Sequence, residues 1–412
     1  MQPTRTGPSF PPTPVRTRPW PEWPIPDAGG RARLLEAFDS GGWNGVAAPA
    51  VVEFEAEFGR YQNAGHAVTC VNGTVSLEIA LSALGVGSGD EVIVPPYTFL
   101  ATATAVLGVN ALPVFADIDP ETYCLDPDAV EAAIGPRTAA VICVHLGGHP
   151  ADLDRLTDIC ERHGVALIED AAHAHGARWR DQPVGTFGQY GSWSFQGSKN
   201  LTAGEGGALT TNDDALAVAA REIRNCGRAE GGAWYDHHRF GGNWRLTAFQ
   251  AALLSAGLER LPGQVERREE CAAHLDEHLA RIEGIRPLRR DPRATTHAHH
   301  LYLFRYDAEA FGGLPLDAFT AALRHEGIPA MPGYPRPLNR QPLFAERRFD
   351  QRATGWRPEY PPTRFDRLDL PVCERACGET VWLPHHVLLA PPGEMSDVVE
   401  AVDVVRRRRL AS

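Results

Sequence analysis

The stretch GSWSFQGSKNLTAGEGGAL, residues 191–209, carries the most informative pattern in the chain. It starts as a short strand candidate, GSWSF, and continues into a Gly- and Ser-rich turn around Lys199. Among the 40 Lys and Arg residues of the protein, Lys199 is the only lysine. Lysine can lose its proton and condense with an aldehyde, whereas arginine can do neither. Keeping a lysine at this position therefore indicates amine chemistry; a chance surface lysine is the alternative.

The sequence before this stretch has the pattern of a mainly parallel sheet. Short apolar runs alternate with helical stretches of about 10–15 residues, as in βαβ units. These strand candidates are AVTCV (67–71), DEVIVP (90–95), LPVFADI (112–118), AAVICVHL (139–146) and VALIED (165–170). In the helix predicted over 153–164, Leu153, Leu156 and Ile159 share one face, and Gly164 is expected to end it. We therefore expect an α/β fold with helices on both faces of the sheet.

The pattern of predicted strands and helices changes after a long helix that we expect to end near Leu261. Isolated strand candidates among helices follow, which is typical of a smaller α+β domain; they lie in EGIRPLRR, HLYLFRYDAE, HEGIPAMPGY and ETVWLPHHVLLA. We place the boundary near residue 255, with a large domain over 19–255 and a small C-terminal domain over 256–412. The N-terminal segment of the large domain is expected to pack on the small one. Residues 1–18 are Pro-rich and have no apolar run, which predicts a disordered tail and no signal peptide.

The composition argues against several classes of protein. A formal net charge of −12 argues against nucleic-acid binding. No stretch approaches the about 18 apolar residues that a membrane span needs. The 8 cysteines are scattered, several in apolar runs, which favours reduced thiols in the cytoplasm. Cys373 and Cys377 form a close pair without a matching second pair, so we expect no zinc site.

Two more features predict a site near Lys199. Asp170 ends the strand candidate 165–170, and ligands of open α/β sheets bind beyond such strand ends. An acidic group, a lone lysine and a Gly-rich turn suggest pyridoxal phosphate, with the acid as partner of its ring nitrogen. Asn72, Gly73 and Thr74 lie between a strand and a helix, where backbone N–H groups suit a phosphate. An ordinary helix cap by Asn72 or Thr74 is the alternative.

Four segments resemble the DegT/DnrJ/EryC1/StrS aminotransferases: PPYTFLATATAV (95–106), EDAAHAHGARW (169–179), the stretch 191–209, and GGNWRLTAFQAALL (241–254). The resemblance extends over about residues 19–405. It implies a fold type I pyridoxal phosphate transferase, with a mostly parallel seven-stranded sheet sandwiched by helices and a smaller α+β C-terminal domain. Members of this family aminate keto-sugars and related rings in secondary metabolism. A branch with histidine in place of the lysine dehydrates its substrate instead, and Lys199 sets that branch aside.

The resemblance also implies roles for individual residues. Lys199 would form the internal aldimine with the cofactor and then move the proton, with pyridoxamine phosphate as the intermediate form. Asp170 would pair with the pyridine nitrogen, and His173 would lie near the ring hydroxyl. The remaining cofactor contacts would be Phe99 stacked on the ring, Gly73, Thr74 and Ser194 at the phosphate, and Asn243 reaching the phosphate of a neighbouring subunit. The last contact implies a homodimer with a shared active site.

Some of these residues have simpler interpretations. Phe99 could be a core residue, and Asn243 could be an ordinary turn residue after two glycines. The histidines at 173, 175, 297, 299 and 300 could be metal ligands, but beside a Schiff-base lysine we expect no metal.

The prediction of the substrate depends on one residue and two short segments, which are less specific than the motif around Lys199. Gln196 stands where many nucleotide-sugar aminotransferases carry histidine. Together with WPEWP near the N-terminus and GYPRPLNRQPLF (333–344), it is similar to the branch of scyllo-inosose aminotransferases and 3-amino-5-hydroxybenzoate synthases. This implies amino transfer from L-glutamine or L-glutamate to a keto-cyclitol or keto-sugar. Candidate contacts are Gln196, Tyr334, Arg336, His385 and His386, each of which could instead be a surface residue. An aromatising synthase and a non-catalytic regulatory relative that binds the cofactor are the alternative functions.

Overall fold

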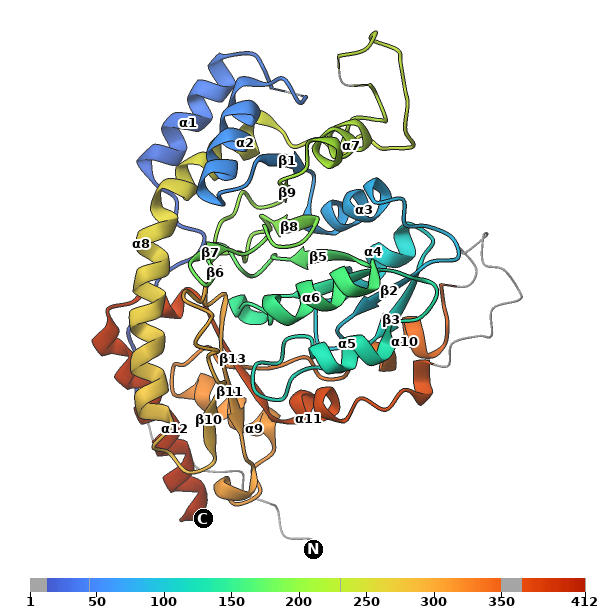
Figure 1. Ribbon diagram of the computed structural model, residues 1–412. Helices are drawn as coiled ribbons and strands as arrows, with labels where there is room; N and C mark the ends of the chain where they lie inside the picture. Colours follow the sequence, from blue (N-terminus) through green and yellow to red (C-terminus); the bar gives the residue numbers. More distant parts are fainter. Residues whose placement is uncertain (1–12, 44, 230, 350–364, 412) are drawn as a thin grey trace, which may run out of the picture.

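The computed structural model of the chain describes residues 13–411, apart from residues 44, 230 and 350–364. A seven-stranded sheet forms its larger part, in the order β1-β9-β8-β5-β4-β2-β3 (Figure 1). Of these seven strands, only β9 runs against its neighbours. The bounds are β1 His66–Cys70, β2 Glu91–Val94, β3 Leu112–Phe115, β4 Thr138–Val144, β5 Ala166–Asp170, β8 Tyr190–Ser194 and β9 Gly207–Thr211. The mostly parallel seven-stranded sheet is therefore confirmed.

Helices pack along this sheet, as expected for an α/β fold. Helix α3 contacts both α4 and α7, and α5 contacts α6 (Figure 1). The bounds are α1 Ala28–Asp39, α2 Pro49–Tyr61, α3 Gly73–Ala83, α4 Ala101–Gly108, α5 Pro127–Ala133, α6 Leu153–His163 and α7 Asp214–Arg224. The prediction for α6 is confirmed, because Leu153, Leu156 and Ile159 are buried and Gly164 ends the helix in the left-handed conformation.

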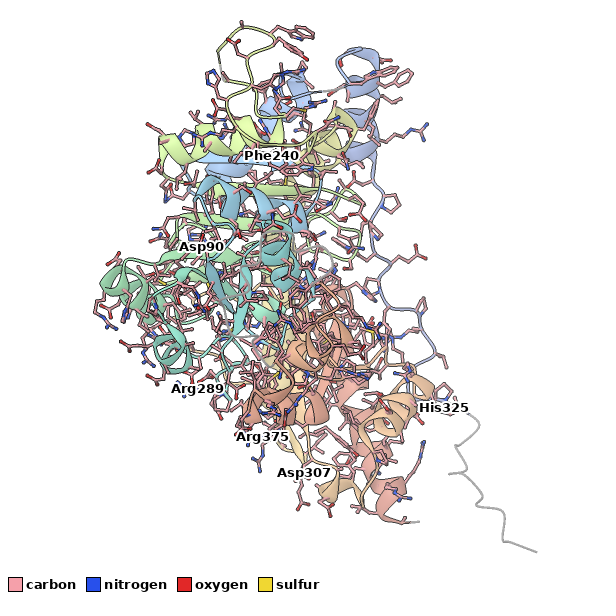
Figure 2. All side chains as sticks on the ribbon, turned by 90° about the vertical axis from the view of Figure 1, so that its right-hand side faces the viewer. Asp90, Phe240, Arg289, Asp307, His325 and Arg375 are labelled. Atoms are coloured by element: carbon pink, nitrogen blue, oxygen red, sulfur yellow. The ribbon has the colours of Figure 1, made fainter. Side chains whose placement is uncertain are left out.

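A four-stranded antiparallel sheet forms the smaller part, in the order β10-β11-β13-β12. Figure 2 shows this part around Asp307 and Arg375, on the other side of the molecule from Phe240. The bounds are β10 Ile285–Pro287, β11 Leu301–Tyr306, β12 Met331–Pro332, β13 Thr380–Pro384, α9 Leu316–His325 and α12 Met395–Leu410. Helices α10 Pro342–Ala345 and α11 Pro371–Glu379 pack with their buried residues in the core of the large sheet. A short hairpin, β6 Arg178–Trp179 and β7 Gln182–Pro183, completes the strands of the described chain.

The long helix α8, Ala248–Leu279, connects the two parts (Figure 1). The prediction that it ends near Leu261 is wrong, because the helix continues through Pro262. Proline removes one backbone hydrogen bond, but apolar residues on both sides of Pro262 are buried. Those before Val265 belong to the core of the large sheet, and those from Cys271 onward belong to the core of the small sheet. The predicted boundary near residue 255 falls inside this helix, and the division of the chain there stays a prediction.

Arg16 is anchored to the smaller part, which differs from the disordered tail predicted over residues 1–18. The Arg16 side chain is buried and forms ion pairs of 2.8 Å with Glu394 and Asp397. Its backbone N–H donates to the carbonyl of Glu326 at 3.0 Å. These carboxylates lie in the smaller part, so two charges hold a segment whose composition alone resembles a free tail. Residues 1–12 lie outside the described residues.

Candidate active site

A cavity of about 900 Å³ lies at the carboxyl ends of β5 and β8, where residues of the small sheet close it. Its volume is in the range of small-molecule sites. All the predicted site residues except Asn243 and Arg336 line it: Gly73, Thr74, Phe99, Asp170, His173, Ser194, Gln196, Lys199, Tyr334, His385 and His386. The topology thus brings together segments that are more than 300 positions apart in the sequence.

Asp170 and Lys199 form the charged pair of the cavity. Asp170 accepts hydrogen bonds from the Thr102 hydroxyl (2.9 Å) and from the N–H of Ala172 (3.2 Å). Burial raises the pKa of Asp170, while the two hydrogen bonds and Lys199 counteract the rise. Burial lowers the pKa of Lys199 to about 8, and Asp170 opposes this shift. The lysine therefore has a sizeable neutral fraction near physiological pH, as a nucleophile or base requires.

The first turn of α3 forms a cradle for an anion. The side chain of Asn72 caps the helix by accepting from the N–H of Val75 at 2.9 Å. Gly73 and Thr74 are the first residues of the helix, so their N–H groups have no carbonyl partner within it. A Cβ on Gly73 would lie 2.7 Å from the Cβ of Ser194, and a Cβ on Gly207 would lie 2.4 Å from the Asn72 carbonyl. Glycine at both positions thus lets three backbone segments meet at one point.

His173 and His300 both line the cavity, and their rings contact each other at a tilt with centroids 4.2 Å apart. The N–H of Gly147 donates to Nδ1 of His173 at 3.3 Å, which leaves the ring proton on Nε2. Burial lowers the pKa of both rings well below the ordinary value, so both are neutral. His173 therefore offers a hydrogen-bond donor to an oxygen in the cavity.

The predicted substrate residues differ in whether their polar groups remain available to a ligand in the cavity. Gln196 lines the cavity, but its Oε1 already accepts from the N–H and hydroxyl of Ser198 at 2.8 and 2.7 Å. Both ring nitrogens of His385 are engaged inside the protein. Tyr334 and His386 line the cavity, whereas Arg336 is exposed and does not. The structure therefore brings Arg336 to the surface and not into the site.

Asn243 also lies outside the cavity of its own chain. It is exposed and forms a backbone bridge with Asn225, at the end of α7. The preceding loop carries three exposed aromatic side chains: Trp234 (77%), Tyr235 (74%) and Phe240 (97%). The predicted contact of Asn243 with a neighbouring subunit stays a prediction.

Several residues of the site are missing from the sequence prediction. Thr102 holds Asp170, and its position one helical turn after Thr98 in PPYTFLATATAV was the available signal. For His300, the sequence suggests only a role as a metal ligand. Trp23 lines the cavity from the N-terminal segment, and its indole donates to the carbonyl of Gly197 at 3.1 Å. Nothing in the local pattern around Trp23 indicates a contact across 174 positions.

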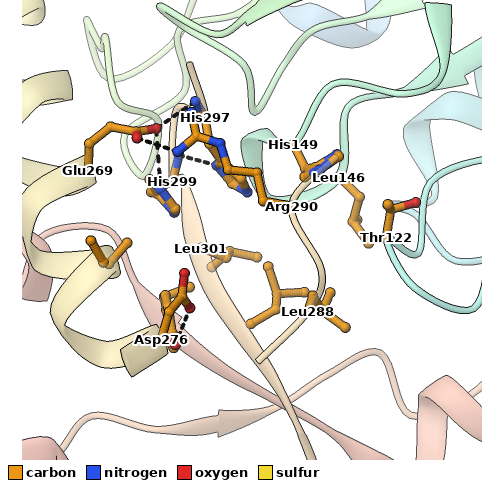
Figure 3. A pocket seen from close by; sticks show the side chains of 14 residues that line it. Thr122, Leu146, His149, Glu269, Asp276, Leu288, Arg290, His297, His299 and Leu301 are labelled. Carbon is orange, nitrogen blue, oxygen red and sulfur yellow. Dashed lines mark hydrogen bonds and ion pairs between the residues drawn. The ribbon is translucent and has the colours of Figure 1, made fainter. Parts of the chain in front are cut away.

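A second cavity, of about 70 Å³, lies between α8 and β11 (Figure 3). Glu269 is its central polar group: it accepts from the N–H of His297 at 2.6 Å and pairs with Arg290 at 2.5 Å. His297 in turn accepts from the N–H of His299 at 2.8 Å. These side chains satisfy one another. Among the described residues, no group of three His, Cys, Asp or Glu side chains has a metal-binding arrangement.

The chain matches known proteins over almost its full length. The family model of the DegT/DnrJ/EryC1/StrS aminotransferases matches residues 28–403. An L-glutamine:scyllo-inosose aminotransferase of Streptomyces griseus is 42% identical over 404 residues, 94% of each chain. An L-glutamine:2-deoxy-scyllo-inosose aminotransferase of Micromonospora echinospora is 41% identical, over 95% of this chain and 96% of that protein. The crystal structure of a 3-amino-5-hydroxybenzoic acid synthase superimposes with a TM-score of 0.85 and 36% identity, covering 96% of this chain and 99% of that one.

Proposed function

Because the chain belongs to the DegT/DnrJ/EryC1/StrS aminotransferase family, we propose that it transfers an amino group from L-glutamine to a cyclic polyhydroxy ketone, with pyridoxal phosphate bound at Lys199. L-glutamate is the alternative donor. The acceptor is a keto-cyclitol of the scyllo-inosose type, and the product is an aminocyclitol for antibiotic biosynthesis. Two relatives at 41–42% identity, both L-glutamine-dependent inosose aminotransferases, support this assignment.

The residues of the cavity fit the cofactor. The cradle of Gly73, Thr74 and Ser194 suits its phosphate, and Phe99 suits a face of its ring. Asp170 lines the same cavity as Lys199 and would be the acidic partner of the ring nitrogen. When bound, pyridoxal phosphate supplies an electron-withdrawing ring that stabilises negative charge on the substrate carbon.

The protein's own groups prepare the site for proton movement. Thr102 and Ala172 orient the Asp170 carboxylate, and a cation facing it would favour its ionised form. The Lys199 amine, with its pKa lowered to about 8, can give up and take back a proton. His173 presents a fixed N–H, which stabilises an anionic oxygen without changing its own charge.

One observation supports an acceptor without a nucleotide diphosphate. Of the described residues that line the cavity, Lys199 is the only lysine or arginine. Diphosphates are usually held by several such side chains. Among the polar residues that line the cavity, Gln196, Tyr334 and His386 are neutral and suit the hydroxyls of a polyhydroxy ring.

A substrate panel tests the proposal. The purified protein, loaded with pyridoxal phosphate, is given L-glutamine and either scyllo-inosose or a nucleotide-linked keto-sugar, and the products are identified by mass spectrometry. We expect an aminocyclitol from the first mixture, at a kcat/KM at least ~100-fold above that with the nucleotide sugar. Equal or better amination of the nucleotide sugar would overturn the choice of acceptor.

The structural similarity to 3-amino-5-hydroxybenzoic acid synthase favours a second candidate, an aromatising reaction on an amino-substituted ring. This activity would yield an aromatic amine, which absorbs strongly in the near ultraviolet, whereas an aminocyclitol does not. The same panel, extended by an aminoshikimate-type ring, therefore separates the two functions.

We also propose that the enzyme is a cytoplasmic homodimer whose active site both subunits complete. Phe99 lines the cavity yet is 63% exposed, and the aromatic loop before Asn243 is exposed as well. A second copy that covers these side chains would also bring an Asn243 toward the cavity. All eight cysteines are free thiols, which fits a reducing compartment. No helix in the described ranges is both long and apolar enough to cross a membrane.

A further inference from the structure

The residues on both sides of Lys199 are held by two histidines of the small sheet. Nε2 of His385 lies 3.0 Å from the carbonyl oxygen of Ser198, and Nδ1 of His300 lies 3.2 Å from Oδ1 of Asn200. The two histidines belong to one unit, because the N–H of His385 donates to the carbonyl of His300 at 3.2 Å. Their rings stack with centroids 5.6 Å apart. The ends of β11 and β13 thus contact the chain immediately before and immediately after the lysine.

The hydrogen bonds fix the protonation of both rings. Nδ1 of His385 lies 3.1 Å from Nη2 of Arg268, which can only donate, so the ring proton is on Nε2 and points to Ser198. The amide nitrogen of Asn200 donates to the carbonyl of Ala298 at 2.7 Å, so its oxygen faces His300 and accepts from Nδ1. Each histidine is therefore a neutral donor with one defined partner next to Lys199.

Apart from its contact with His385, Arg268 on α8 makes few polar interactions in the described part of the chain. It is fully buried and forms no ion pair there, and its Nε and Nη1 atoms have no hydrogen-bond partner. Its guanidinium lies 5.8 Å from the Trp23 ring, which itself contacts the His385 ring edge-on. A buried cation without a counter-charge is destabilising. Such a residue is hard to explain as packing alone, whereas it does orient His385.

We propose that His300, His385 and Arg268 are positioning residues that hold Lys199 at the reacting position, so that the small sheet sets the place of the reactive amine. The proposal rests on the proposed function, since it assumes that Lys199 performs the chemistry. It also gives His385 a role other than substrate contact. Misplacing a reacting group by about 1 Å can cost ~100-fold in rate, so holding the Ser198 backbone and the Asn200 side chain on the two sides of the lysine has a kinetic value.

The single lysine makes a direct test possible in the full chain without cofactor. Reductive ¹³C-methylation labels Lys199 and the α-amino group, and the signal missing from Lys199→Ala identifies the lysine. His385→Leu removes the donor to Ser198, whereas His385→Gln keeps an N–H near the same place. We expect the lysine of the leucine variant to titrate well above the wild-type value of about 8, toward 10.5, because its amine gains access to water. The glutamine variant should titrate like the wild type.

Kinetics of the loaded enzyme provide the second readout. We expect kcat to fall ~10- to 100-fold in His385→Leu with little change in KM for glutamine, and to stay within about threefold in His385→Gln. Arg268→Met should resemble the leucine variant and Arg268→Gln the wild type. If both His385→Leu and Arg268→Met fold and leave the lysine titration and kcat unchanged, the proposal is wrong.

A control variant at His149 and a second pair of variants at His300 complete the test. His149→Leu removes an equally buried histidine beside the second cavity, where it donates to the carbonyl of Pro150 at 2.6 Å. It should leave the lysine titration unchanged; an equal shift would mean that general loosening is the cause. If His385→Leu does not fold, His300→Leu and His300→Asn repeat the comparison at Asn200. A normal lysine response in a protein that aminates no tested ketone would contradict the proposed function and not the positioning.

Discussion

The Lys199 amine and the Asp170 carboxylate influence each other's charge. Burial disfavours the charge on each of them, and each partly restores the charge of the other. Because Asp170 also accepts two hydrogen bonds, it is better supported as an ion than Lys199 is. The lysine therefore becomes neutral at a lower pH than an exposed lysine, which is what its proposed chemistry requires.

The pH dependence of cofactor uptake follows from this shift. In the cofactor-free protein, the rate of lysine-dependent binding of pyridoxal phosphate should rise with pH and level off above about 8, because the pKa of Lys199 is lowered and only the neutral amine reacts. Stopped-flow absorbance between pH 6 and 10 measures it. Lys199→Ala should lose this phase and at least ~1,000-fold in activity. A rise centred near the ordinary value of 10.5 would contradict the shift.

Individual residues were predictable where their chemistry is unusual. A lone lysine and an aspartate at a strand end stand out in any sequence, and both line the cavity. Thr102 and His300 act through one hydrogen bond each, and such residue types are common everywhere in a chain. Arg336 is the opposite case: its motif pointed to the substrate, but its side chain is exposed outside the cavity.

At the scale of elements, five apolar runs predicted five strands of the large sheet, because strands buried on both faces carry little besides apolar residues, and the segment GSWSF predicted a sixth. Strand β9, GALTT, was missed because it is short and half polar, although every residue in it is buried. The end of α8 was misplaced because proline disfavours helix locally, while burial of apolar residues on both sides of Pro262 sustains the helix.

The start of α3 provides a prediction about the cofactor cradle. In Gly73→Ala the new methyl group would lie 2.7 Å from the Cβ of Ser194, so α3 and β8 must move apart. We expect the dissociation constant of pyridoxal phosphate to rise at least ~10-fold, measured by quenching of tryptophan fluorescence. Gly263→Ala, on α8, is the matched control, because an added Cβ meets nothing within 4 Å there. Unchanged cofactor affinity in Gly73→Ala would argue against the cradle.

At the scale of the molecule, the two sheets were predictable but their contact was not. Each sheet follows from local patterns, whereas Trp23, His300 and His385 reach the turn of Lys199 from distant parts of the chain. Likewise, Arg16 is fixed by carboxylates more than 370 positions away. Long-range pairings of this kind leave no periodicity or spacing in a single sequence.

Mixing two inactive variants tests the shared active site. If Asn243 acts in the neighbouring subunit, a dimer of Lys199→Ala with Asn243→Ala has one site with both residues intact. Unfolding and refolding a 1:1 mixture should then restore about a quarter of the wild-type activity, because half of the dimers are mixed and each holds one good site. Activity no higher than the sum of the two separate variants would show that each subunit uses its own Asn243.

Helix α8 has a consequence for the way the molecule comes apart. Its first half supplies Leu254 and Leu261 to one hydrophobic core, and its second half supplies Leu275 and Leu279 to the other. The two cores are therefore joined by one continuous helix. Melting of the small sheet would therefore remove the support of the large one, so the two parts are expected to lose their structure together in one cooperative transition.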